Sequence, residues 1–173
     1  SSSSSSSKRK VAIVTNQSCI GRKLLTEDSL SSMHSMMKQE IEQQGGYIDS
    51  IHVAPDTPEN ASDRRKPGPG MLLEAMSLHH VEPDNTAMVG DTINDMLAAS
   101  RAGVGTRILV CTGHGEKRGF ELKAKGIQLP LLLRESSGSD DNNGDDAFGI
   151  PAEALPCWIC ADLNAAVDLL CAS

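Results

Sequence analysis

Aromatic side chains are scarce in this 173-residue chain, where Phe, Trp and Tyr together make up 2% of the sequence. A hydrophobic core therefore has to be built from Leu, Ile, Val, Met and Ala, and hydrophobic residues reach an ordinary 39%. Excess basic charge is also lacking, because 16 Lys and Arg stand against 23 Asp and Glu, for a net charge of −7. Such an acidic balance argues against a nucleic-acid or membrane-surface partner.

Long apolar runs are absent as well, and none approaches the roughly 20 residues of a membrane-spanning helix. The length suffices for one domain with a real core. The first residue is Ser rather than Met, which predicts a processed chain or a piece of a longer protein. Residues 1–10 are seven serines and a short basic run, so we expect a disordered leader before a folded domain at 11–173.

The five cysteines are odd in number and scattered, which favours reduced thiols and a cytoplasmic location. Cys157-Trp-Ile-Cys160 has the spacing of a redox or zinc motif, but it lies in an apolar run typical of a strand. Residues i and i+3 of a strand point to opposite faces, so we interpret the pair as two buried or half-buried thiols. No second Cys-x-x-Cys motif is present to complete a zinc site.

Short apolar runs alternate with helical patterns along the chain. Strands are predicted at 11–14, 47–53, 86–89, 106–111 and 157–160, and helices from Thr26 to Gly45 and at 69–80, 94–102, 116–125 and 163–170. This alternation predicts an α/β fold, Rossmann-like, with a parallel sheet between two layers of helices and ligands beyond the carboxyl ends of the strands. A stretch rich in Ser, Gly, Asp and Asn predicts a disordered insertion at about 134–147.

The first long helix carries an apolar stripe. Leu30, Met33, Met37 and Ile41 recur at helical spacing after Thr26. Such a stripe is typical of a helix that packs on a core, so we expect these side chains to be buried rather than to bind a cofactor.

Polar groups follow the first predicted strand. Thr15 and Asn16 stand at its carboxyl end, where a hydroxyl and backbone N–H groups can hold phosphate oxygens, although a plain turn explains the same residues. Lys66 precedes Pro67 and a helix start, where its charge can neutralise a phosphate. A solvated basic loop is the alternative for Lys66, because Arg64 and Arg65 directly precede it.

Paired carboxylates follow the third predicted strand. Asp91 ends that strand and Asp95 lies one helical turn further on, so the two can converge. Hard oxygen ligands of this kind suit Mg²⁺. The alternative is that Asp91 caps the next helix and Asp95 complements its dipole, but capping alone does not require Gly90. The segment Gly113-His-Gly115 follows the next strand, where it could line the rim of the cleft, although a plain turn is the favoured interpretation.

Three segments in this order resemble the haloacid dehalogenase (HAD) phosphatase superfamily. They are Val14-Thr-Asn-Gln-Ser-Cys-Ile-Gly-Arg22, Arg65-Lys-Pro-Gly-Pro-Gly-Met-Leu-Leu73 and Met88-Val-Gly-Asp-Thr-Ile-Asn-Asp-Met96. In detail they are similar to the branch of D-glycero-D-manno-heptose 1,7-bisphosphate phosphatases and histidinol-phosphatases. Ala102-Gly-Val-Gly-Thr106 and Leu109-Val-Cys-Thr-Gly113 continue the match, which covers about residues 11–114.

The resemblance implies a phosphatase that uses Mg²⁺ and acts on a small phosphorylated substrate, and we expect a monomer. In the family an Asp nucleophile forms an aspartyl-phosphate that water then hydrolyses. Thr15 and Asn16 would hold the phosphoryl group, Lys66 would balance its charge, and Arg65 would contact the sugar phosphate. Asp91 would bind Mg²⁺ and Asp95 would support that site.

The chain departs from the family in two places. The family's Asp-x-Asp-Gly-Thr motif on the central strand is missing, because only Ser, Lys and Arg precede Val11. We therefore expect a sheet that lacks its middle strand and a fold that is incomplete at its N-terminus. Ala54, Asp56, Ser62 and Arg64 stand where many members carry the Cys and His of a zinc loop, so we expect no zinc.

Three hypotheses follow from the missing nucleophile, and the simplest is a non-functional remnant that would be unfolded when expressed; the other two give the protein a role. In the first of these, the intact protein is a phosphatase, and this chain is a fragment that is inactive alone. In the second, the chain is a catalytically dead, HAD-derived module that binds phosphate or regulates another process.

Overall fold

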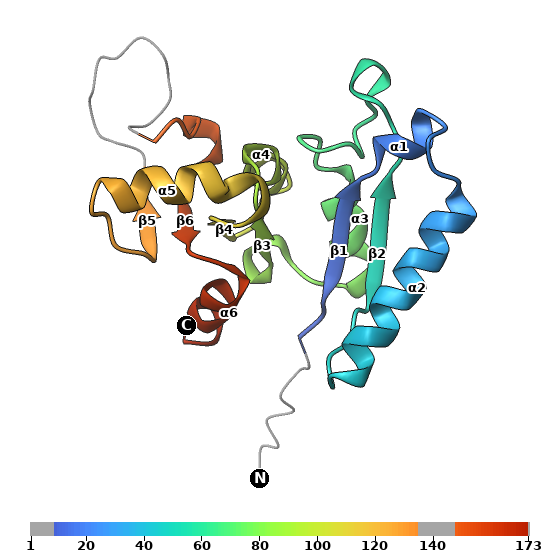
Figure 1. Ribbon diagram of the computed structural model, residues 1–173, viewed down its shortest axis with the longest axis horizontal. Helices are drawn as coiled ribbons and strands as arrows, with labels where there is room; N and C mark the ends of the chain where they lie inside the picture. The colour runs from blue at the N-terminus through green and yellow to red at the C-terminus, as the bar shows by residue number, and fades with distance from the viewer. Residues whose placement is uncertain (1–8, 135–147, 173) are drawn as a thin grey trace.

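The strands form two sheets in a computed structural model that describes residues 9–134 and 148–172 (Figure 1). The first sheet pairs β1 (Ala12–Asn16) in parallel with β2 (Ser50–Ala54). The second has the order β3-β4-β6-β5. Its strands are β3 (Ala87–Gly90), β4 (Thr106–Val110), β6 (Cys157–Cys160) and β5 (Leu131–Leu133). Within the described residues the sheet is thus split, as expected of an α/β fold without its middle strand.

Three helices accompany the first sheet: α1 (Ser18–Gly21), α2 (Glu27–Gln43) and α3 (Gly70–His79). The side chain of Thr26 caps α2 by accepting the N–H of Ser29, and Gly45 follows the helix with a φ of +81°. Figure 1 shows α2 lying along the outer side of β2, away from the second sheet. We call this part of the chain, up to α3, the first unit.

The apolar stripe of α2 is buried only in part, so that expectation is wrong for Met33. Leu30 is 7% exposed, whereas the side chain of Met33 is 57% exposed. Met37 and Ile41 are half-buried. A sheet of two strands offers α2 a narrow surface, so the far side of the stripe has nothing described to pack on.

Three further helices accompany the second sheet: α4 (Ile93–Arg101), α5 (Glu116–Ala124) and α6 (Leu163–Cys171). Short 3₁₀ turns lie at η1 (Pro58–Asn60), η2 (Pro83–Asn85), η3 (Gly113–Gly115) and η4 (Ala152–Ala154). The strand β5 was not predicted, and it pairs with β6 in the antiparallel direction. We call the part from β3 onward the second unit.

The hydrophobic core is concentrated in the second unit. Its largest fully buried side chains include Met96, Ile108, Leu109 and Ile159. Two apolar clusters cover the two faces of the second sheet, one of them containing Cys157 and the other Cys160. Both thiols are fully buried, and their places in separate clusters confirm that they point to opposite faces. Burial raises the pKa of the Cys160 thiol, which keeps it protonated and unreactive.

Several contacts join the units. Leu72 and Met76 of α3 belong to the larger apolar cluster of the second unit, and Val14 of β1 packs against it. Arg9, placed in the leader by its sequence, donates from its guanidinium to the main-chain oxygen of Leu170 in α6 at 3.1 Å. The rest of the predicted leader, residues 1–8, and insertion residues 135–147 lie outside the described residues. Among the helices at 9–134 and 148–172, none combines the length and apolarity needed to cross a membrane.

Candidate active site

A buried lysine connects the two units. The ammonium of Lys66 donates to the main-chain oxygen of Val14 in β1 at 2.9 Å and to Oδ1 of Asp95 in α4 at 2.6 Å. The two side chains of this ion pair are 13% and 5% exposed. One cation therefore binds the backbone of the first unit and a carboxylate of the second, close to the carboxyl ends of β1 and β3.

Asn16 holds the backbone of Lys66. Its Nδ2 donates to the main-chain oxygen of Lys66, and its Oδ1 accepts the N–H of the same residue, each at 3.0 Å. Neighbouring Thr15 accepts a hydrogen bond from Nε2 of Gln17 at 3.2 Å. The structure thus brings the predicted Asn16 and Lys66 together, with the Asn16 amide turned to the lysine backbone, while Thr15 keeps its hydroxyl proton for another acceptor.

Asp95 is fully engaged by its neighbours. Its Oδ2 accepts the N–H of Thr92 at 3.0 Å and the Thr92 hydroxyl at 2.7 Å, while Oδ1 holds Lys66. Thr92 and Asp95 form a capping box at the start of α4, so Thr92 rather than Asp91 is the cap. The backbone of Gly90 approaches so closely that a Cβ there would lie 2.4 Å from that of Asp95. Glycine at position 90 is therefore explained by the packing of Asp95.

Asp91 stands at the carboxyl end of β3 and faces the loop after β4. Its Oδ2 accepts the main-chain N–H of His114 at 2.9 Å and lies 2.9 Å from Nδ1 of the same ring. Burial works against the ionised form, but the hydrogen bonds and charge of His114 hold the pKa of Asp91 below its usual value. The side chain is 35% exposed. Asp91 is thus an ionised carboxylate open to solvent.

These carboxylates differ in their fitness for a metal. Mg²⁺ prefers hard oxygen ligands and keeps several waters, so one exposed carboxylate such as Asp91 fits it. Both oxygens of Asp95 are occupied by Lys66 and Thr92, so Asp95 could support a metal at Asp91 only indirectly. Across the described ranges, no three His, Cys, Asp or Glu side chains gather as a ready-made metal cage.

The basic loop before α3 is organised by ion pairing and hydrogen bonds. Arg64 binds Glu74 of α3 through two nitrogens, at 2.7 and 3.1 Å. Arg65 turns the other way and donates to the main-chain oxygen of Asp56 at 2.7 Å. Asp56 and Ser62, two of the positions matched to a zinc loop, hydrogen-bond each other. The expected absence of zinc stays a prediction.

Two residues at the site were not assigned from the sequence. His114 sits in the segment interpreted as a plain turn, and that segment is indeed a 3₁₀ turn, yet it contacts Asp91. The signal was its place after β4, the strand that neighbours β3. Thr92 could have been found from the spacing Thr-x-x-Asp, which is the pattern of a capping box.

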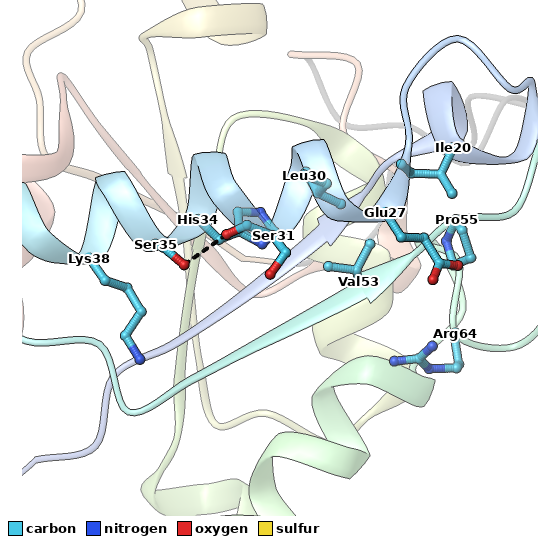
Figure 2. Close-up of a pocket in the computed structure, with 10 residues that line it drawn as sticks. All are labelled: Ile20, Glu27, Leu30, Ser31, His34, Ser35, Lys38, Val53, Pro55 and Arg64. Carbon is cyan, nitrogen blue, oxygen red and sulfur yellow. Dashed lines mark hydrogen bonds between the residues drawn. The ribbon is translucent and has the colours of Figure 1, made fainter.

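A well-defined hollow lies away from these residues. A depression of about 420 Å³ lies between α2 and the β2 end of the first sheet, with Leu30 and Val53 at its base (Figure 2). His34 and Lys38 of α2 line one side of it, and Arg64 lies at the opposite end. None of Thr15, Lys66 or Asp91 lines it. The chemistry-bearing residues therefore lie outside this hollow.

A known protein family matches the middle of the chain, where most of the site residues lie. A family model described as HAD-hydrolase-like matches residues 63–128, a range that contains Lys66, Asp91, Asp95 and His114.

Curated relatives extend the match. The chain is 38% identical over 120 residues to the D-glycero-beta-D-manno-heptose-1,7-bisphosphate 7-phosphatase of Neisseria meningitidis serogroup A, covering 69% of this chain and 62% of the relative. It is 33% identical over 135 residues to the enzyme of the same name from Pasteurella multocida, covering 72% and 73%. A crystal structure of D,D-heptose 1.7-bisphosphate phosphatase from B. bronchiseptica, complexed with magnesium and phosphate, is similar with a TM-score of 0.66 and 26% identity. That likeness covers 94% of this chain and 74% of the other.

The fold and this site indicate a HAD-like hydrolase. The indications are the split sheet, the ion pair of Lys66 with Asp95 and the carboxylate of Asp91 after β3. Within that class, the chain belongs to the family of HAD heptose-1,7-bisphosphate phosphatases. It spans about 62% of the length of its Neisseria relative.

Proposed function

We propose that this chain is part of a Mg²⁺-dependent phosphatase that hydrolyses a small sugar phosphate of the heptose bisphosphate kind. The observation that carries the proposal is the position of Lys66, a cation joined to both units beside the carboxyl ends of β1 and β3. A phosphoryl group placed there would meet a fixed positive charge on one side and Asp91 on the other. Charge arranged in advance around a phosphoryl group is the main source of catalysis in phosphoryl transfer.

Four side chains of the site have defined tasks in this proposal. A lysine ammonium has three N–H donors, and Lys66 uses two on Val14 and Asp95, which leaves one for a phosphoryl oxygen. Thr15 would donate its hydroxyl proton to a second oxygen. Asp91 would hold Mg²⁺, which when bound would draw charge from the phosphoryl oxygens. Asp95 would keep Lys66 charged and in place.

The attacking carboxylate is not among these residues. No Asp or Glu precedes Glu27, and that residue lies in the first turn of α2, outside the sheet. We propose that the nucleophile belongs to a segment outside these 173 residues, on a strand that pairs with β1 on one side and β3 on the other. In Figure 1 the unpaired edge of β1 in the first sheet faces the unpaired edge of β3 in the second. This arrangement supports the proposal, because parallel strands normally have partners on both sides.

The catalytically dead module remains the second candidate. It is favoured by the fact that the network of Lys66, Asp95 and Thr92 is already complete within this chain. Such a module would bind phosphate without turning it over.

The deciding experiment compares this chain with the longest product of its native transcript. We expect the longer product to release phosphate from heptose 1,7-bisphosphate in the presence of Mg²⁺, and the 173-residue chain to bind inorganic phosphate without turnover. A longer product that lacks an Asp-x-Asp motif and releases no phosphate would support the dead module. Failure of both proteins to bind phosphate would overturn both candidates.

A further inference from the structure

The loop between β2 and α3 is closed by a hydrogen-bonded clasp. The carboxylate of Asp56 accepts the main-chain N–H of Ser62 at 2.9 Å and also the Ser62 hydroxyl. These residues lie six positions apart, so the clasp ties the beginning of the loop to its middle. Because the loop lies on the surface, the clasp supplies order that burial does not.

Arg65 binds the same loop through two main-chain oxygens. Its Nη1 donates to the main-chain oxygen of Asp56 at 2.7 Å, and its own N–H donates to the main-chain oxygen of Ser62 at 3.1 Å. Asp56 therefore binds Ser62 through its side chain and Arg65 through its backbone. The three residues form a closed set, and the guanidinium of Arg65 is held against the loop.

Main-chain hydrogen bonds connect the clasp directly to the turn that carries Lys66. Gly68 donates its N–H to the main-chain oxygen of Arg65 at 2.7 Å, and Gly70 donates to that of Asp63 at 3.0 Å. A Cβ at position 68 would lie 2.1 Å from the main-chain oxygen of Asp63, so only glycine fits this turn. A change at the clasp is thus transmitted to Lys66 by backbone geometry.

We propose that Asp56 is a positioning residue, which together with Ser62 holds Arg65 and Lys66 in place to receive phosphoryl oxygens. The inference rests on the proposed function, and it adds a residue that neither contacts the phosphoryl group nor binds the metal. Asn16 fixes Lys66 from the side of β1, and the clasp fixes it from the side of β2.

Charge supports the same arrangement. The hydrogen bonds from the hydroxyl and N–H of Ser62 hold the pKa of Asp56 below its usual value, and the charges of Arg64 and Arg65 act in the same direction. The carboxylate therefore stays ionised at neutral pH, and the clasp stays formed there.

Amide hydrogen exchange of the full chain tests the mechanical half of the inference. In Asp56→Ala, the amides of Lys66 and Gly70 should exchange about tenfold faster, while that of Leu109 in β4 keeps its rate, because the loss is local. Asp63→Ala is the matched control, since the described contacts of Asp63 come from its main chain. Unchanged exchange at Lys66, or equal acceleration at Leu109, would overturn the inference.

Coupling to Arg65 tests the functional half. Inorganic phosphate is titrated into the chain with Mg²⁺ present, for Asp56→Ala, Arg65→Ala and the double variant. Because Asp56 acts partly through Arg65, its substitution weakens phosphate binding about tenfold in the parent and by clearly less once Arg65 is gone. Equal weakening in both backgrounds would show a merely structural role. A parent chain that binds no phosphate would refute the proposed function, and the exchange rates would still decide the clasp.

Discussion

The two units of the chain are packed very differently. Among the described residues of the first unit, the buried hydrophobic side chains outside α3 are Leu30 and Ala54, and α3 packs Leu72 and Met76 into the apolar cluster of the second unit, which contains most of the core. Yet the site draws on both, with Thr15 and Lys66 in the first unit and Asp91 in the second. The comparison teaches that the part of the site proposed to bind phosphate lies in the less well packed unit.

The difference has a plain physical origin in the sheets. Strand β4 lies between β3 and β6, while β1 has β2 as its single described neighbour. The run from Val11 to Val14 is the kind of continuous apolar sequence that is normally buried on both faces. Here Ile13 and Val14 are only half-buried. The first unit therefore depends on its contacts with the second, chief among them the ion pair of Lys66 and Asp95.

Breaking that ion pair should have the largest effect. Lys66→Met leaves the carboxylate of Asp95 buried without its cation, which typically costs about 3–5 kcal/mol. Phosphate binding should fall by about 100-fold or more, since a fixed charge on the phosphoryl group is lost. Urea unfolding and phosphate titration measure the two losses.

The double variant Lys66→Met/Asp95→Asn separates the two effects, because a side-chain amide oxygen still accepts from Thr92. It should recover much of the stability, because no unpaired charge remains buried, but none of the phosphate binding. A Lys66→Met chain that keeps its affinity for phosphate would contradict the role given to this lysine.

Core truncations should sharpen the contrast between the units. Ile108 of β4 is fully buried, and Ile108→Ala should cost about 2–5 kcal/mol through lost burial and a cavity. Ile13→Ala in the half-buried β1 should cost roughly 1 kcal/mol, because fewer contacts are removed. Equal costs in urea unfolding would mean that the two units are equally well packed.

Asp91→Asn should remove the effect of Mg²⁺ on phosphate binding, which we expect to be about tenfold in the parent chain. The exposed Asp84→Asn serves as the control. Because the pKa of Asp91 lies below its usual 3.8, its carboxylate stays ionised above that pH. Ionisation of Asp91 should therefore not limit Mg²⁺ dependence between about pH 8 and 5, and its contribution should be lost only as the pH falls below about 4. Persistent Mg²⁺ dependence in Asp91→Asn would refute the metal assignment.

The smallest effect is expected at the helix cap. Thr92→Ala removes the hydroxyl that accepts the N–H of Asp95 and should cost about 1 kcal/mol. Thr92→Ser keeps the hydroxyl and should lie close to the parent. A loss several times larger for Thr92→Ala would show that Thr92 also governs the orientation of Asp95 toward Lys66.

Much of the fold could be predicted from local sequence pattern. The strands at β1, β3, β4 and β6 follow apolar runs, and the cap at Thr26 marks the start of α2. The three-residue β5 is too short to show a period, so it could not be recognised. The exposure of Met33 could not be predicted either, because helical spacing identifies an apolar face without saying whether a partner covers it.

The site was predictable in its members but not in its bonds. Lys66, Asp91 and Asp95 were identified from motifs and from a family resemblance. The pairing of Asn16 with the backbone of Lys66 joins residues 50 positions apart, which local pattern cannot reveal. The same holds for the contact of His114 with Asp91. Motifs name the groups that carry chemistry, whereas tertiary structure decides which of them remain available to a ligand.

The most direct test is a nuclear magnetic resonance titration of the chain with inorganic phosphate in the presence of Mg²⁺. The account predicts shifts in the amide signals of Thr15 and Lys66 in the first unit and of Asp91 and Thr92 in the second, at one common affinity. The same shifts should be absent from Lys66→Met. Shifts confined to one unit, or none at all, would contradict a phosphate site assembled from both.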